Sequence, residues 1–143
     1  MTDPQEVFQL ALQRYREAVH AKDAAALVSL YDEDVSVFDT WGAWSLRGRE
    51  AWHKLVADWF GSLGEERVAV EFDQVASVDT ADLVVGHAFV TFAAFSPQGE
   101  RLRWLTNRMT LALRRHGEDW KIVHEHTSVP IEHATLKAIL QRG

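Results

Sequence analysis

The stretch Trp120–Pro130, with the sequence WKIVHEHTSVP, contains residues whose types and spacing could do chemistry. Its alternating pattern predicts a β-strand in which residues two apart point to the same face. His124 and His126 would share that face, and imidazoles can transfer protons near neutral pH or bind a ligand. The other side chains of this face would be Trp120, Ile122 and Ser128. The alternative interpretation is a pair of hydrogen-bonded structural histidines.

The same two histidines have a spacing that occurs in some metal sites, but two imidazoles do not make a site. A third ligand would have to come from elsewhere in the chain, with Asp39 and His87 as candidates. The chain has no cysteine, which excludes thiolate ligands, cysteine nucleophiles and disulfides. We therefore predict a protein with no metal ion and no other cofactor.

Three helical patterns precede most of the predicted strands. The sequence DPQE at residues 3–6 combines an N-cap, a proline in the first turn and a capping-box acid. Asp23 is predicted to cap a second, short helix, and Arg49–Phe60 carries a third helical stripe of apolar residues. We expect a short terminal helix over Ile131–Leu140. The predicted strands are Val35–Phe38, Val68–Val78, Leu83–Phe95, Leu102–Arg115 and Trp120–Val129.

The long strands are joined by short turns that contain Asp, Gly or Pro, which is typical of an antiparallel meander. We predict a single α+β domain over residues 1–143, with three N-terminal helices packed on a curved antiparallel sheet and a short C-terminal helix. Both faces of the third long strand contain apolar residues, with Met109 and Leu111 on one face and Trp104 and Ala112 on the other. No helix remains to cover the second face, so we predict a homodimer that buries it.

The composition excludes several classes of protein. The 143 residues suffice for one hydrophobic core, and 47% of them are hydrophobic. The formal net charge is −6 and Lys and Arg form no cluster, so we expect no nucleic-acid partner. No apolar run approaches the roughly 18 residues of a membrane span, and the N-terminus lacks a signal-peptide pattern. We expect a cytoplasmic protein with no membrane partner.

The segment LQRYREAVHAKDAAALVSLYDEDVSVFD, residues 12–39, resembles the corresponding part of bacterial ketosteroid isomerase. In that enzyme, the tyrosine of an RY pair is an oxyanion-hole donor and an aspartate just after the first strand is the general base. The resemblance places these roles on Tyr15 and Asp39. The enzyme also uses a protonated carboxylic acid as a second donor. This chain departs from that pattern, because its third long strand offers Thr106, Arg108 and Thr110 and no acid.

The segment NRMTLALRRHGEDWKIVHEHTSVP, residues 107–130, is similar to the ending shared by SnoaL-like proteins and the association domain of calcium/calmodulin-dependent protein kinase. Its pattern is Arg-x-Thr, a turn, and then Trp-x-Ile-x-His-x-His-x-Ser. Over essentially its whole length, the chain thus resembles the SnoaL-like and ketosteroid-isomerase-like (NTF2-like) superfamily. This resemblance implies a cone of helices on a bent sheet around a pocket. Isomerases, cyclases, binders and oligomerisation modules share the fold, so the fold does not decide the function.

Each candidate site residue also has a structural interpretation. Tyr15 on an apolar helix face can be a core residue, and Asp39 can cap the loop after its strand. Arg108 can hold an anionic or carbonyl-bearing ligand, or it can pair with an acid such as Asp39 or Glu125. The remaining candidate ligand-binding residues are Trp41, Trp104, Thr110 and His124.

These residues lead to two hypotheses about function. The first is a cofactor-free isomerase or cyclase that acts on a hydrophobic small molecule with a carbonyl or carboxylate group. Asp39 would be the general base, and Tyr15 with Arg108 or His126 would stabilise the developing oxyanion. The second is a non-catalytic ligand-binding or oligomerisation module, which the missing second acid suggests. The sequence leaves open which sheet face lines the pocket, because a one-residue change in strand register exchanges the faces.

Overall fold

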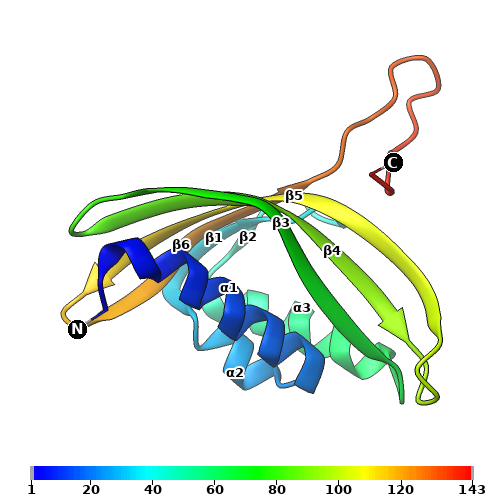
Figure 1. The fold of residues 1–143 in the computed structure, drawn as a ribbon, viewed down its shortest axis with the longest axis horizontal. Coiled ribbons are helices and arrows are strands. Elements are labelled where there is room, and N and C mark those ends of the chain that lie inside the picture. Colours follow the sequence, from blue (N-terminus) through cyan, green and yellow to red (C-terminus); the bar gives the residue numbers. More distant parts are fainter. Residues whose placement is uncertain (1, 143) are drawn as a thin grey trace.

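The computed structural model describes residues 2–142 and shows helices on the concave side of one curved sheet (Figure 1). The helices are α1 (Pro4–Ala21), α2 (Ala24–Val28) and α3 (Arg49–Ser62). The strands are β1 (Tyr31–Phe38), β2 (Leu46–Arg47), β3 (Arg67–Asp79), β4 (Leu83–Phe95), β5 (Arg101–His116) and β6 (Asp119–Ser128). The sheet has the order β2-β1-β6-β5-β4-β3, which confirms the α+β class. No helix among residues 2–142 is both long and apolar enough to cross a membrane.

The first two helices begin at the capping residues that the sequence predicted. The Asp3 carboxylate accepts a hydrogen bond from the Gln5 backbone N–H at 2.9 Å, and the Asp23 carboxylate accepts one from the Ala26 N–H at 3.0 Å. Both bonds satisfy donors that have no partner within the helix. From there, α1 buries one apolar stripe, which consists of Val7, Phe8, Ala11, Leu12, Tyr15, Ala18 and Val19.

The helix α1 comes very close to the sheet at Gly86 in β4. A Cβ atom on Gly86 would lie 2.5 Å from the ring of Phe8, well inside van der Waals contact. Glycine therefore allows the aromatic ring to lie directly on the strand backbone. This contact sets the spacing between the helix and the sheet at one end of the core.

The sheet is not wholly antiparallel as predicted, because β1 pairs in parallel with β6. Val37 lies opposite Glu125 and Phe38 lies opposite His126. Such a pair requires a long connection between its strands, and here α3 and the meander β3 to β5 provide it. As a result Asp39, the first residue after β1, lies beside the C-terminal end of β6.

A β-bulge in β6 changes which residues face the helices. Ala112 of β5 pairs with His124, but the next residue, Leu113, pairs with Ile122, so Val123 is an extra residue. Strict alternation predicted Ile122 on the same face as the two histidines, and this prediction is wrong. The extra residue instead puts Ile122 and Glu125 on the inner face, where both are buried.

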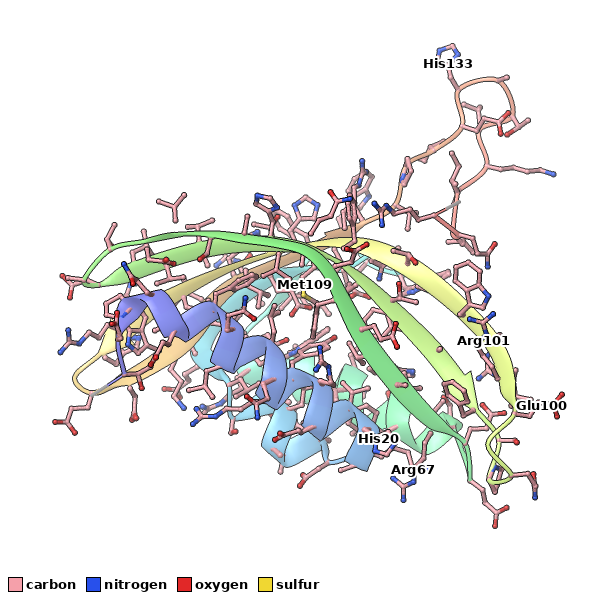
Figure 2. All side chains as sticks on the ribbon, in the orientation of Figure 1. His20, Arg67, Glu100, Arg101, Met109 and His133 are labelled. Carbon is pink, nitrogen blue, oxygen red and sulfur yellow. The ribbon has the colours of Figure 1, made fainter. Side chains whose placement is uncertain are left out.

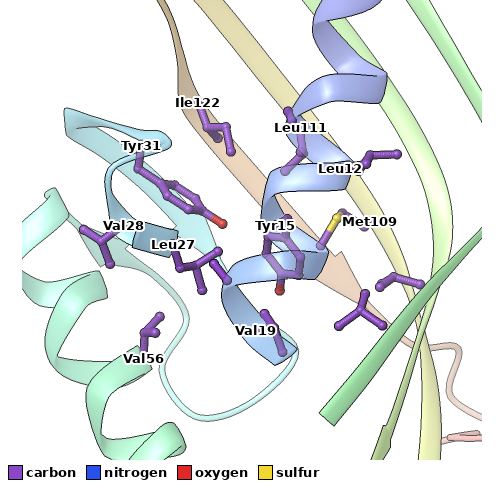
Figure 3. Packing of buried hydrophobic residues seen from close by; sticks show 14 of the residues in the cluster. Leu12, Tyr15, Val19, Leu27, Val28, Tyr31, Val56, Met109, Leu111 and Ile122 are labelled. Atoms are coloured by element: carbon purple, nitrogen blue, oxygen red, sulfur yellow. The ribbon is translucent and has the colours of Figure 1, made fainter. Parts of the chain in front are cut away.

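The hydrophobic core fills the space between the helices and the concave face of the sheet (Figure 3). Met109 of β5 points into this space (Figure 2), and Asn107 and Leu111 are buried on the same face. The intervening residues Arg108 and Thr110 are exposed on the convex face. The strand β5 thus separates an inner row of residues from an outer row.

The segment after β6 is not the helix that the sequence predicted over Ile131–Leu140. Its residues form a loop closed by a bridge between Ile131 and Ala138, and Leu136 has a left-handed φ of 58°. The loop projects from the convex side of the sheet (Figure 1), and Ile131 and Leu136 remain exposed. A short helix needs an apolar surface on which to pack several side chains, and only Leu140 of this segment is partly buried.

Candidate active site

A cavity of about 630 Å³ lies between α1, α3 and the inner face of the sheet. Its volume is in the range of small-molecule sites. Most of its wall is aromatic or aliphatic and includes Trp41, Trp52, Leu55, Trp59, Phe92, Trp104 and Leu105. Its polar side chains are Tyr15, Asp39, Arg103, Asn107, Glu125, Thr127 and Gln141. Two other hollows of similar size lie along α1, and neither contains this polar group.

Asp39 enters the cavity from the end of β1. One carboxylate oxygen accepts a hydrogen bond from the Trp41 backbone N–H at 3.2 Å, and the other accepts one from the Thr127 hydroxyl at 3.2 Å. The Thr127 hydroxyl in turn accepts a bond from the Thr40 N–H at 2.9 Å. Burial raises the pKa of Asp39, while these hydrogen bonds oppose the rise. Asp39 is therefore an oriented carboxylate that is more basic than one in water.

Tyr15 comes from the buried stripe of α1 and reaches the same cavity. Its ring makes edge contacts with Phe72 and Phe92, at centroid distances of 6.2 and 6.4 Å. Burial raises the pKa of its hydroxyl well above 10, and the carboxyls of Glu125 and Asp39 raise it further. The phenol thus stays protonated and can donate a hydrogen bond to a ligand.

Glu125 is the most buried acid of the site, with 1% of its surface exposed. Its carboxyl accepts a hydrogen bond from the Tyr31 hydroxyl at 2.5 Å. Burial raises the pKa of Glu125 to about 7, the Tyr31 hydrogen bond lowers it, and the nearby Asp39 raises it again. Tyr15 and Tyr31 lie in the same buried cluster (Figure 3). A substantial fraction of Glu125 is therefore protonated at neutral pH and can act as an acid.

Asn107 supplies a polar group without a protein partner. Its side chain is 5% exposed and lines the cavity, and its Oδ1 accepts no hydrogen bond from the described residues. A buried polar atom without a partner is costly unless something else satisfies it. A ligand could do so, and rotation of the terminal amide could present its NH₂ group instead.

The two carboxyls of the cavity have different surroundings and thus different chemistry. Asp39 accepts two hydrogen bonds that favour its charged form, whereas Glu125 is more deeply buried and accepts one. Neither takes part in a salt bridge among the described residues, and Arg103 at the cavity wall is paired with Glu66 at 2.7 Å. Two carboxyls whose environments differ in this way can serve as a base and an acid in one site.

The structure brings together half of the residues that the sequence singled out. Tyr15, Asp39, Trp41 and Trp104 all line the cavity. The other four lie on the convex face of the sheet and do not line it, and they are Arg108, Thr110, His124 and His126. The bulge in β6 places Glu125 on the inner face of the sheet, and Asn107 of β5 also faces inward. The residues that alternate with them along the two strands therefore point outward.

The two histidines of β6 form a small aromatic group on the convex face. The Phe38 ring contacts His124 at 4.9 Å and His126 at 5.5 Å between centroids. His124 Nδ1 donates to the Ser36 carbonyl oxygen at 2.7 Å. Arg108 Nε donates to the Ser128 hydroxyl at 3.1 Å, and forms no salt bridge with Asp39 or Glu125. No group of three or more potential metal ligands occurs within residues 2–142, so the histidine pair has no third ligand there.

The polar residues of the cavity that were not predicted as site residues are Arg103, Asn107, Glu125, Thr127 and Gln141. Tyr31, which bonds to Glu125 from outside the cavity lining, was not predicted either. A signal for Glu125 and Thr127 exists in the sequence, because both alternate with the two histidines and therefore lie on the opposite face of the strand. The prediction placed the face with His124 and His126 at the pocket, whereas the face with Glu125 and Thr127 lines the cavity. Tyr31 and Asn107 have no comparable sequence signal, since their roles depend on partners that are distant in the chain.

Comparison with solved structures first identifies the fold. An NTF2-like protein of unknown function from Pseudomonas putida KT2440 has a TM-score of 0.84 at 24% identity, over 98% of this chain and 95% of that chain. A candidate calcium/calmodulin-dependent protein kinase II association domain from Xanthomonas campestris has a TM-score of 0.69 at 18% identity, over 90% and 88% of the two chains. The chain thus has an NTF2-like fold.

Comparison of the sequence then identifies the family. Residues 9–132 match the family described as the SnoaL-like domain, and the chain belongs to this family. The Steroid Delta-isomerase of Nocardioides simplex is 31% identical over 91 residues, which cover 64% of this chain and 66% of that enzyme. The match thus spans slightly less than two thirds of the enzyme's length.

Proposed function

We propose that the protein is a cofactor-free isomerase or cyclase that acts on a hydrophobic carbonyl compound in this cavity. The observation that carries the proposal is that Asp39 and Tyr15 line the same largely apolar cavity, together with a second acid, Glu125. The similarity to a steroid isomerase and the volume of about 630 Å³ agree with a bulky, apolar substrate. The aromatic wall would bind the carbon skeleton, and the polar end would bind the carbonyl group.

In the proposed reaction, the Asp39 carboxylate removes a proton from the carbon next to the carbonyl group. The C–H bond breaks, its electron pair forms an enolate, and the proton moves to Asp39. The Tyr15 hydroxyl donates a hydrogen bond to the enolate oxygen, and Asn107 and the protonated form of Glu125 provide further donors. In an isomerisation, Asp39 then returns the proton to a different carbon, so that the double bond moves and the site needs no other reagent.

The test is the turnover of Δ5-3-ketosteroids and of polyketide-like carbonyl compounds, followed by absorbance. We expect Asp39→Asn to lower kcat by about 100- to 10,000-fold, the typical contribution of a general base. Asp58→Asn is the matched control, because Asp58 lies on the exposed face of α3. Equal rates for the wild type and Asp39→Asn would remove Asp39 from the mechanism. Absence of turnover with every compound, together with a ligand retained on purification, would favour the alternative function, a binding module.

We further propose that the protein forms a homodimer through the convex face of the sheet. This face exposes Phe38, Val78 and Val85 at 41%, 73% and 39%, so three strands contribute large apolar side chains. Such a surface is typical of an interface. Sedimentation should show a dimer that Val85→Glu converts to a monomer, while Ala57→Glu on the exposed side of α3 leaves it intact. A monomeric wild type would contradict the proposal. A cytoplasmic location remains a prediction from the sequence.

A further inference from the structure

Leu140 and Gln141 line the cavity although a projecting loop separates them from β6 (Figure 1). The Thr106 backbone N–H in β5 donates to the Leu140 carbonyl oxygen at 2.8 Å. The Gln141 amide donates to the Trp104 carbonyl oxygen at 2.9 Å. The pairing of β5 with β6 ends at Arg108, so the returning segment occupies the edge of β5 beyond that point. It completes the cavity wall where no strand does so.

A few contacts hold this segment against the domain. Arg142 forms a salt bridge with Asp73 in β3 at 2.7 Å, and its guanidinium lies 4.1 Å from the ring centre of Phe89 in β4. The two side chains of the salt bridge are 42% and 62% exposed, and exposed ion pairs contribute little to stability. Leu140 is partly buried, whereas the other residues from 131 to 142 are exposed. One apolar side chain and several weak polar contacts thus seat the segment.

Most of the rest of the cavity wall is held more firmly. It belongs to helices and strands that share a common buried core, and Asp39, just after β1, is held by hydrogen bonds from Trp41 and Thr127. Segments with few buried contacts open at the lowest free-energy cost. If residues 131–142 moved away, β5 would lose one backbone hydrogen bond from Thr106 and every strand would remain paired. The cavity would then open beside Trp104 and Leu105, which line it at this edge.

We propose that residues 131–142 are a movable wall of the cavity, in which Leu140 and Gln141 control ligand entry and limit ligand length. Arg142 is the positioning residue that holds this wall closed through Asp73 and Phe89. The inference rests on the proposed function only in taking the cavity as the ligand site, and it requires no reaction there. It assigns ligand selection to a segment that is separate from the helix that carries Tyr15 and from the strand end that positions Asp39.

The first test measures opening without any ligand. Hydrogen exchange of the Thr106 amide, followed by NMR, reports on the bond to Leu140. Arg142→Ala should accelerate this exchange about fivefold, which corresponds to ~1 kcal/mol. Arg114→Ala is the matched control, because Arg114 is an exposed arginine at the other end of β5. An unchanged Thr106 rate in Arg142→Ala would overturn the role of Arg142.

The second test locks the wall. The chain has no cysteine, so an Asp73→Cys/Arg142→Cys variant carries only two thiols, which a short bis-maleimide can join. The probe is Nile red, a neutral, hydrophobic carbonyl compound whose fluorescence rises on binding. We expect cross-linked protein to bind it at least tenfold more slowly than the same variant blocked with N-ethylmaleimide. Equal rates in the two forms, or no binding by either, would overturn the proposal.

The third test concerns ligand length. Leu140→Ala should enlarge the cavity at this edge and shift the preference towards longer members of a series of alkyl ketones, measured by displacement of Nile red. Leu136→Ala is the control, because Leu136 is 78% exposed on the same loop and does not line the cavity. The same preference in both variants would contradict a role for Leu140 in selection. None of the three tests uses turnover, so a failure of the isomerase proposal would be seen separately.

Discussion

Glu125 offers the most direct test of the electrostatics of the cavity. Burial raises its pKa from 4.5 to about 7, against the hydrogen bond from Tyr31. In the unfolded chain the carboxyl ionises near 4.5, so between pH 4.5 and 7 the folded state keeps a proton that the unfolded state has released. This contribution to stability is complete below pH 4.5, decreases as the pH rises, and is lost above about pH 7.

The substitution Glu125→Gln isolates this effect. A glutamine has nearly the same shape and can still accept the Tyr31 hydrogen bond, but it carries no charge at any pH. The difference between pKa values of 4.5 and about 7 corresponds to roughly 3 kcal/mol of unfolding free energy. We therefore expect Glu125→Gln to match the wild type near pH 4.5 and to be about 3 kcal/mol more stable at pH 8.

The assay is urea unfolding of the wild type and the variant at pH 4.5, 6 and 8, followed by tryptophan fluorescence. Glu65→Gln is the matched control, because Glu65 is an exposed glutamate next to the end of α3 and should give a small difference at every pH. If the stability difference between Glu125→Gln and the wild type is the same at pH 4.5 and pH 8, Glu125 is not a buried acid with a raised pKa. The interpretation of Glu125 as the acid of the site would then be wrong.

Two further predictions concern stability. Tyr31→Phe removes the only hydroxyl bonded to the Glu125 carboxyl among the described residues, and should cost ~1–3 kcal/mol in urea unfolding, with the larger loss at pH 8; no loss at either pH would contradict the pairing. Gly86→Ala places a methyl group against the Phe8 ring and should cost about 1–3 kcal/mol. Gly61→Ala, where a Cβ atom meets open space in α3, should stabilise the protein by ~0.5–1 kcal/mol. If Gly86→Ala and Gly61→Ala changed the unfolding free energy in the same direction, this comparison would be refuted.

The sequence predicted the elements well where the signal is local. The helix starts at Asp3 and Asp23 depend on one side chain and the N–H groups next to it, and the four long strands depend on alternation and short turns. The predicted terminal helix over Ile131–Leu140 was wrong, because only Leu140 of this segment finds a surface on which to pack. Periodicity describes one segment, whereas a helix at the end of the chain also needs a surface on which to pack.

The site could be predicted only in part, for a related reason. Tyr15 and Asp39 came from a resemblance to a known enzyme, and both line the cavity. His126 and Arg108 came from strand alternation, which shows that neighbouring residues face opposite ways but not which way is inward. The extra residue Val123 then reversed the relation between Ile122 and the histidines.

By itself, the sequence determined the α+β class, the capping residues of the first two helices and the meander, because all of these follow from interactions between residues close together in the chain. Only the tertiary structure decided which acid joins Asp39 in the cavity. The parallel pairing of β1 with β6 places the end of one strand beside the other, and the bulge turns Glu125 inward. The contact between Leu140 and β5 was likewise decided by the path of the folded chain. These contacts join residues that are far apart in the sequence, and no local pattern encodes them.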